Sequence, residues 1–392
     1  MACHRENFTG AAEVRLYAAL MPTRIMSKEM HLTMPEEIFH LNVSEMVRLL
    51  SQAYVSLLKS NTPFREFPSV MLWGSPGVGK SQGVREVASR IERETGKTVV
   101  ITDVRLLLFN PVDLRGIPTA NADKTLSVWL KPKIFQMDES EETVNILFLD
   151  EISAAPQSVQ AAAYQITLDR MVGEHRLPEN CIVIAAGNRV TDRSVAYNMP
   201  KALANRLCHL EIRADPAAWH DWAVQKGLHR FVVGYLAYNP VALMRFEPSG
   251  TSLAFPTPRS WEMVSNILAK VSEDIDTVFP LVVGCIGEET ARSLKTWSRL
   301  YDQLPAPEEI FAGTSAVKPR AEELRTALRS SLVEYARRHP EPDGLARSID
   351  HACTLPWEYR KALLRDYSLI PAVNQALESN QVFRDAIRRE EK

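Results

Sequence analysis

The chain has 392 residues, 45% of them apolar and 24% charged, which are ordinary values for a globular protein with a sizeable core. Lys and Arg together number 46 and Asp and Glu 48, so no overall charge favours nucleic acid or a membrane surface as a partner. No apolar run is long enough to cross a bilayer, and the length suits two or three domains.

The N-terminus lacks the apolar core of a signal peptide, and the five cysteines show no C-x-x-C spacing. We therefore expect a cytoplasmic protein in which the cysteines are reduced core residues, without a disulfide framework or a zinc site. These cysteines are Cys3, Cys181, Cys208, Cys285 and Cys353.

Residues 1–38 are expected to form an irregular or β-containing N-terminal extension. From Met46 to Leu58 the apolar residues recur at the spacing of one helix face, which should belong to the core. The apolar stretch 69–73 predicts a buried strand, and the spacing of apolar residues over 84–91 predicts a second helix.

A glycine-rich loop lies between this strand and this helix and matches the pattern G-x-x-x-x-G-K-[ST]. Its backbone N–H groups are expected to face phosphates at the positive end of the helix dipole. Lys80 should lie against the β- and γ-phosphates, and the Ser81 hydroxyl should bind Mg²⁺. A chance match in a turn is the alternative, but the strand and helix on either side favour a nucleotide-binding loop. Its residues are Gly74, Ser75, Pro76, Gly77, Val78, Gly79, Lys80 and Ser81.

Two segments of the chain predict β-hairpins. After a second strand at 98–102, a polar turn at 121–124 separates the extended segments 113–118 and 125–130. Further on, the segment 170–177 turns at its central Gly-Glu pair. Neither tip carries an aromatic stacking platform or a basic stripe, which weakens an interpretation as a nucleic-acid translocator.

The apolar strand predicted at 145–149 ends in two acids, Asp150 and Glu151. In open α/β sheets the C-terminal ends of buried parallel strands face the ligand. We expect Asp150 to hold Mg²⁺ through water and Glu151 to orient and polarise the attacking water. The alternative is that the two acids cap the helix that begins near Gln157.

The next apolar strand, predicted at 181–186, is followed by Asn188. Its amide could hydrogen-bond the γ-phosphate or the attacking water, although an Asn after a strand is usually a turn former. A fifth strand is predicted near Leu210, and the pattern from Asp215 onward is helical, with a linker near 304–307. We therefore divide the chain into an extension (1–38), an α/β nucleotide-binding domain (39–214), a helical lid (215–315) and a helical C-terminal extension (316–392).

Five motifs in order resemble those of AAA+ ATPases, most closely the MoxR-like and dynein-related group. They are the phosphate loop, the strand ending in Asp150 and Glu151, the strand end at 187–189, and the segments 203–207 and 256–260. The resemblance covers roughly residues 40 to 300. It implies a five-stranded parallel sheet between helices, with helix-2 and pre-sensor-1 hairpin inserts, a small all-α lid and a helical C-terminal extension.

The resemblance also implies roles for two arginines. Arg206 matches the arginine finger that reaches the γ-phosphate of a neighbouring subunit, and Arg189 and Arg193 fit that motif less well. A solvated arginine at a helix end is the alternative for Arg206. Arg259 matches the second sensor and could serve its own nucleotide or a neighbour's. An arginine supplied in trans implies a homo-oligomer, by family resemblance a hexameric ring.

The leading hypothesis is an ATPase that uses ATP and Mg²⁺ to remodel or activate a protein client. By resemblance it works beside a separate von Willebrand A domain protein. The sequence has no D-x-S-x-S string of that module, which fits such an arrangement without proving it. The two hairpins would then contact the client, although they could simply cover a sheet edge. The alternatives are a motor subunit of a nucleic-acid-acting complex and a nucleotide-gated scaffold with little turnover.

Overall fold

The computed structural model describes residues 39–189, 199, 204–247, 252–315 and 317–378. The predicted N-terminal extension, Arg193 and the end of the predicted C-terminal extension lie outside these ranges. No helix in the described part of the chain is long and apolar enough to span a membrane.

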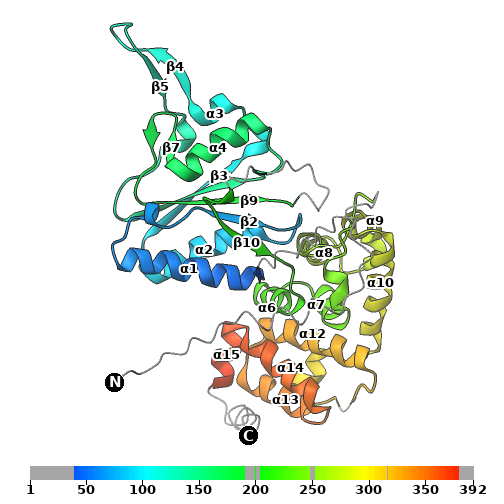
Figure 1. The fold of residues 1–392 in the computed structure, drawn as a ribbon. Helices are drawn as coiled ribbons and strands as arrows, with labels where there is room; N and C mark the ends of the chain where they lie inside the picture. The colour runs from blue at the N-terminus through cyan, green and yellow to red at the C-terminus, as the bar shows by residue number, and fades with distance from the viewer. Residues whose placement is uncertain (1–38, 190–198, 200–203, 248–251, 316, 379–392) are drawn as a thin grey trace, which may run out of the picture. The chain divides into compact units, whose positions relative to one another are not determined.

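A six-stranded, fully parallel sheet organises the first half of the described chain (Figure 1). The strand order is β1-β10-β2-β9-β6-β3. The five predicted strands are therefore confirmed, and a two-residue edge strand, β1, is added. The strands are β1 (His40–Leu41), β2 (Val70–Trp73), β3 (Thr98–Arg105), β6 (Thr143–Asp150), β9 (Cys181–Gly187) and β10 (Cys208–Ile212).

Helices cover both faces of this sheet. Alternate residues of β6, such as Ile146 and Phe148, pack with α1 (Val43–Lys59) and α2 (Lys80–Thr95). The intervening Leu147 and Leu149 pack with α4 (Gln157–Asp169). Because both faces are buried, the central strands are continuous apolar runs.

Both predicted hairpins form. One pairs β4 (Ile117–Ala120) with β5 (Ser127–Leu130), after a 3₁₀ turn, η2 (Leu106–Leu108), and the short helix α3 (Pro111–Arg115). The other pairs β7 (Met171–Val172) with β8 (His175–Arg176). In Figure 1 the β4–β5 hairpin extends away from the sheet beyond α3.

The rest of the described chain is helical. The helices are α6 (Pro216–Lys226), α7 (Arg230–Tyr238), α8 (Pro258–Lys270), α9 (Ile275–Ile286), α10 (Glu288–Ser298), α11 (Pro307–Ala312), α12 (Glu322–Arg338), α13 (Pro342–Ala352), α14 (Trp357–Ser368) and α15 (Pro371–Glu378). Helix α10 ends at Ser298 and passes into a 3₁₀ turn, η6 (Arg299–Gln303).

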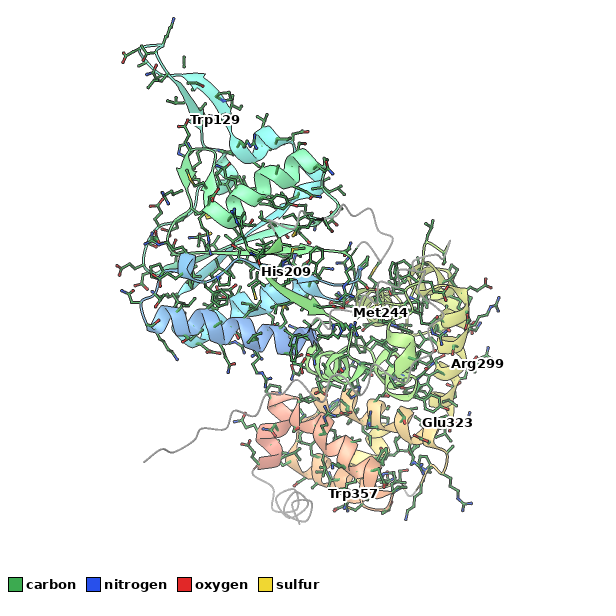
Figure 2. The ribbon with its side chains drawn as sticks, in the orientation of Figure 1. Trp129, His209, Met244, Arg299, Glu323 and Trp357 are labelled. Carbon is green, nitrogen blue, oxygen red and sulfur yellow. The ribbon has the colours of Figure 1, made fainter. Side chains whose placement is uncertain are left out.

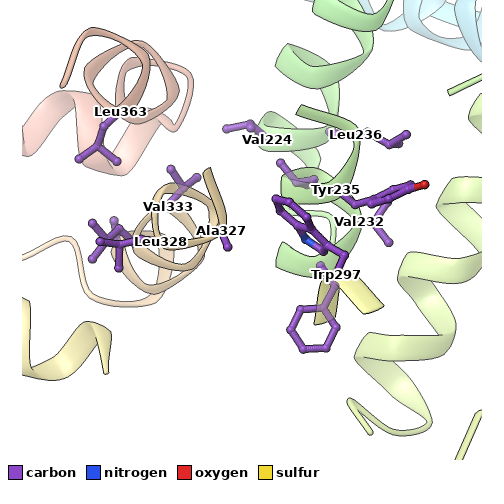
Figure 3. Close-up of a cluster of buried hydrophobic side chains, with 14 of the residues drawn as sticks. Val224, Val232, Tyr235, Leu236, Trp297, Ala327, Leu328, Val333 and Leu363 are labelled. Carbon is purple, nitrogen blue, oxygen red and sulfur yellow. The ribbon is translucent and has the colours of Figure 1, made fainter. Parts of the chain in front are cut away.

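The buried side chains of these helices form one cluster that runs from Trp219 to Leu377. Figure 3 shows part of it, with Tyr235 and Trp297 on one side and Leu328 and Leu363 on helices of the C-terminal region. A lid ending at residue 315 and an extension beginning at 316 stay a prediction, because this cluster includes residues from both sides of that boundary.

The cysteine prediction is correct only in part. All four cysteines of the described ranges are free thiols. Cys181 is buried, but Cys353 is exposed and is therefore not a core residue. Cys353 caps the C-terminus of α13. At a helix end, the spacing of nearby apolar residues does not predict whether a side chain is buried or exposed.

Candidate functional site

The predicted phosphate loop connects β2 to α2 at the C-terminal end of the sheet. Among the described residues no side chain caps α2, and its first turn carries no acidic residue. By contrast, Asn42 caps α1 and Asp215 caps α6. The free N–H groups and the positive end of the dipole of α2 can therefore bind an external anion.

Gly77 and Gly79 have the left-handed backbone that this loop requires, with φ values of 77° and 112°. A Cβ at Gly77 would also lie 2.7 Å from the Oγ1 atom of Thr257. Glycine is therefore needed at position 77 for both its conformation and its close approach to the N-terminus of α8.

Lys80 is the first residue of α2, and its side chain is largely buried. Its Nζ atom donates to the Gly74 carbonyl at 2.5 Å and to Asn188 Oδ1 at 3.0 Å. The ammonium group is thus held over the loop and tied to the end of β9. The structure therefore brings the predicted sensing residue Asn188 to the predicted phosphate-binding lysine.

Ser81 and Asp150 lie in direct contact, with the Ser81 hydroxyl donating to Asp150 Oδ2 at 2.9 Å. Ser81 comes from the start of α2, and Asp150 ends β6. A hydroxyl and a carboxylate are hard oxygen ligands, and Mg²⁺ in phosphate sites uses one or two such groups together with water and phosphate oxygens. The pair therefore fits the predicted magnesium site.

Glu151 follows Asp150 with a φ of 59°, in the left-handed region that non-glycine residues rarely adopt. Its N–H donates to Asp150 Oδ1 at 2.9 Å, and the next N–H, of Ile152, donates to the Ala186 carbonyl of β9 at 3.0 Å. A left-handed backbone at Glu151 directs its side chain away from that of Asp150. Left-handed conformations of non-glycine residues cluster at functional sites. Among the described residues no hydrogen bond or ion pair engages the Glu151 carboxylate.

Asn188 is positioned by its backbone, because its N–H donates to Ser153 Oγ at 2.9 Å. Lys80, Ser81, Asp150, Glu151 and Asn188 all line one cavity of about 70 Å³. This cavity is part of the C-terminal end of the sheet, where open α/β folds bind ligands.

Arg259 lies in the first turn of α8 and lines the same cavity. Its N–H donates to the Gly77 carbonyl at 3.3 Å, and its side chain is exposed. The N-terminus of α8, capped by Thr257, therefore packs directly on the phosphate loop of the same chain.

A second cavity of about 250 Å³ adjoins the first and shares Gly77, Gly79, Ser81 and Arg259 with it. The N-termini of α1 and α8 and the side chains of Trp219 and Trp222 on α6 also line it. The two tryptophan ring centroids are 6.2 Å apart. A largely apolar pocket beside a phosphate loop suits a flat aromatic group.

Sequence reasoning missed this second cavity. Its walls come from segments near residues 42, 78, 219 and 258, which no single motif connects. The only signal in the sequence was the Trp219–Trp222 pair, and its spacing fits an ordinary core helix equally well.

Arg206 does not join this site. It is exposed and instead lines a separate cavity with Arg65 and Arg170. Arg189, the other described candidate for the finger, forms an ion pair with the buried Glu211, which also contacts Arg213 at 3.1 Å. The structure therefore keeps Arg189 within its own chain and leaves Arg206 on the surface.

A comparison with protein-family models gives a match for the segment that contains the phosphate loop and most of the sheet. Residues 69–209 match the family model described as "ATPase family associated with various cellular activities (AAA)". By this match the segment is similar to ATPase domains of the AAA class, and its sheet order and phosphate loop agree with that similarity. No curated protein sequence matches the chain.

Several solved structures are similar to the chain at low identity. A putative ATPase from Cytophaga hutchinsonii is 16% identical, with 88% of this chain and 92% of that chain covered and a TM-score of 0.29. The ORC2 protein of Aeropyrum pernix is 13% identical over 78% and 82%, with a TM-score of 0.33. A RuvB mutant of Thermotoga maritima is 12% identical over 89% and 90%, with a TM-score of 0.32. Such low scores give these structures no weight for the function of this chain.

Proposed function

We propose that this chain hydrolyses ATP in the presence of Mg²⁺, and that its active form is an oligomeric ring which remodels or activates a protein client. The observation that carries the proposal is the convergence of Lys80, Ser81, Asp150, Glu151 and Asn188 on one cavity at the N-terminus of α2.

In this proposal the chain acts mainly by positioning and by electrostatic stabilisation. The N–H groups of the loop and Lys80 bind phosphate oxygens, while Ser81 and Asp150 hold Mg²⁺, which would neutralise charge on the phosphates. Glu151 orients water and accepts its proton, because its carboxylate has no protein partner among the described residues. Asn188 links the water to Lys80 through its side-chain amide. The cavity beside Trp219 and Trp222 takes the nucleoside.

The two arginines are proposed to act from different subunits. Arg259 belongs to the first turn of α8, which is bonded to the phosphate loop of its own chain, so we assign it to its own nucleotide. Arg206 is exposed and lines a different cavity, which suits contact with a nucleotide held by a neighbouring subunit. An arginine supplied in trans can raise the rate by ~10³ to 10⁵.

The remodelling role rests on the resemblance to MoxR-like proteins and on the exposed β4–β5 hairpin. A von Willebrand A domain protein is the proposed partner, and nucleic acid is not proposed as a direct ligand. Affinity capture of the Glu151→Gln variant with ATP and Mg²⁺ from the native host tests this role. A stoichiometric protein partner is expected, and nuclease-sensitive nucleic acid in its place would contradict the proposal.

The ATPase itself is tested by phosphate release from the wild-type protein with ATP and Mg²⁺, with Lys80→Ala as the comparison. We expect steady release from the wild type and loss of both ATP binding and release in the variant. Equal ATP affinity in the two proteins would show that the nucleotide lies elsewhere.

A further inference from the structure

Exposed apolar side chains gather around the β4–β5 hairpin. Such side chains normally occur singly on a protein surface, and a contiguous group marks an interaction site. Of the large apolar side chains that are exposed in the described residues, six come from one short stretch. They are Leu107, Leu108, Val112, Ile117, Leu126 and Leu130.

Several of these side chains line a groove of about 510 Å³. Its walls are η2 with Leu108, α3 with Val112, and the hairpin with Ile117 and Leu130. Ile117 and Leu130 are directly opposite each other in the antiparallel ladder, so both side chains lie on the same face of the hairpin. The groove therefore has an aliphatic wall on each side.

The shape of the groove is fixed by the backbone. Gly116 has a φ of 92°, and a Cβ at this position would overlap the Leu130 carbonyl, so the hairpin strands meet closely at the base. The other hairpin supports the same base, because His175 Nε2 lies 2.8 Å from the Trp129 carbonyl. Figure 2 labels Trp129 at this place, below the tip of the hairpin. The exposed apolar side chains therefore lie on a hairpin whose base is held in place by contacts with the rest of the domain.

The charged groups at the groove are mostly cationic. Lys131 and Lys133 line it, and neither forms an ion pair with any described residue. The one acid in the lining, Asp113, accepts a hydrogen bond from the Asn110 N–H at 2.8 Å, within the N-terminal cap of α3. An aliphatic groove with two ammonium groups against one carboxylate carries net positive charge, so it is complementary to an apolar ligand that carries carboxylates.

We propose that this groove, formed by η2, α3 and the β4–β5 hairpin, binds an extended segment of the client polypeptide in which apolar side chains are flanked by acidic residues. This inference rests on the proposed remodelling function and specifies the client's chemistry. The concave shape suits side chains of a peptide, whereas a flat lipid surface could not fill it. The mostly aliphatic lining offers little to stacked nucleic-acid bases.

The test uses fluorescence anisotropy of the full chain with two labelled peptides. In one, a run of leucines is flanked by glutamates, and in the other the same leucines are flanked by lysines. The wild-type protein should bind the glutamate-flanked peptide about tenfold more tightly, because opposite charges favour one complex and like charges oppose the other. The preference should weaken as salt is raised.

Two variants identify the groove as the site. Leu108→Ser with Ile117→Ser should weaken binding of the glutamate-flanked peptide about tenfold, because two exposed apolar contacts are lost. Leu253→Ser with Leu281→Ser, which changes exposed leucines in the helical region, is the matched control and should bind normally.

Reversing the charge of the two groove lysines tests directly whether they set the preference for acidic flanks. Lys131→Glu with Lys133→Glu should lose the preference for the glutamate-flanked peptide and gain affinity for the lysine-flanked one. Lys270→Glu with Lys318→Glu should retain the wild-type preference.

Equal binding of both peptides by the wild type, or equal losses in groove and control variants, would overturn the inference. So would groove-dependent self-association in light scattering, or groove-dependent binding to anionic phosphatidylserine vesicles without peptide binding. Phosphate release from ATP is measured on every sample. If release is normal and peptide specificity is absent, only this inference fails, whereas absent release in the wild type contradicts the proposed ATPase independently.

Discussion

The contact between Lys80 and Asn188 connects the phosphate loop to the end of the neighbouring strand. The ammonium group donates to the Gly74 carbonyl, just after β2, and to the Asn188 side-chain oxygen, just after β9. A ligand phosphate could replace either contact without movement of the backbone. In the proposed mechanism, Asn188 reports the presence of a γ-phosphate through a side-chain rotation.

Replacing Ser81 with Ala tests whether its hydroxyl is a ligand of Mg²⁺. The variant should bind Mg²⁺-ATP about tenfold more weakly, since one ligand of the ion and one hydrogen bond to Asp150 are lost. Affinity for ATP without Mg²⁺ should change little. Titration calorimetry with and without the metal measures the difference, and an equal loss in both conditions would contradict the assignment.

Replacing Arg259 with Ala tests whether the second sensor serves its own chain. Nucleotide affinity of a dilute, monomeric sample should fall, because Arg259 lines the cavity of its own phosphate loop. Arg259→Lys, which keeps the positive charge, should recover part of the affinity. An effect that occurs only in assembled protein would assign Arg259 to the neighbouring nucleotide.

At the level of elements, α6 joins the nucleotide region to the C-terminal helices. Trp219 and Trp222 of α6 line the second cavity. On the same helix, His220 contacts the buried Asp366 at 3.0 Å, and Asp221 pairs with Arg365 at 2.7 Å. The helix that lines the proposed nucleoside pocket is therefore fixed by α14.

The proposed nucleoside pocket gives a prediction for α6. Trp222→Ala should weaken ATP binding about tenfold, because a large aromatic surface beside the base is lost. Inorganic triphosphate, which has no base, should bind the variant and the wild type alike. An equal loss for both ligands would mean that the substitution disturbs the phosphate loop instead.

His229 caps α7 and makes the helical region sensitive to acid. Burial lowers the pKa of His229 to about 4, and its Nδ1 accepts a hydrogen bond from the Phe231 N–H, which requires the neutral ring. The pKa in the unfolded chain is about 6.5. Stabilisation by neutral His229 is thus complete above pH 6.5 and is lost progressively as the pH falls toward 4, by up to about 3 kcal/mol.

Urea unfolding followed by tryptophan fluorescence at several pH values tests this effect. His229→Asn keeps a capping oxygen but does not titrate, so its unfolding midpoint should depend less on pH across this window. Parallel pH dependence in the variant and the wild type would exclude His229 as the cause.

The sequence predicted those elements whose structure follows from a local residue pattern. β6 and β9 are continuous apolar runs because both of their faces are buried, and the phosphate loop needs its glycines locally. The sequence predicted a helical region from Asp215 onward but not the bounds of α9, since its residues are apolar nearly all round and Pro280 lies inside it. It also could not predict β1, because two residues show no periodicity.

The candidate site divides in the same way. Lys80 and Ser81 were predictable because they close the glycine-rich loop that follows β2. Asp150 and Asn188 were predictable because Asp150 ends β6 and Asn188 follows β9, and strand ends meet at one edge of a parallel sheet. The cavity proposed for the nucleoside was not predictable, since it depends on how the helical region packs beside α1. The Lys131 and Lys133 groove likewise exists only once the hairpin folds back toward α3.

For the whole molecule, the separation of Arg206 from the nucleotide cavity predicts an active site shared between subunits. Glu151→Gln and Arg206→Ala should each be inactive alone. Mixing them before assembly should restore part of the activity, because a site can then combine Glu151 of one chain with Arg206 of another. No recovery in mixed assemblies, with subunit exchange verified, would contradict a finger supplied in trans.

Hydrolysis of ATP at the cavity beside Glu151 is the claim on which the other assignments depend. The most direct measurement is phosphate release by wild type and Glu151→Gln under saturating Mg²⁺-ATP, with bound nucleotide quantified in the same samples. The account predicts full ATP occupancy in both proteins, with release at least about a hundredfold slower in the variant. Equal release rates at equal occupancy would show that Glu151 does not act on the attacking water and would contradict the account.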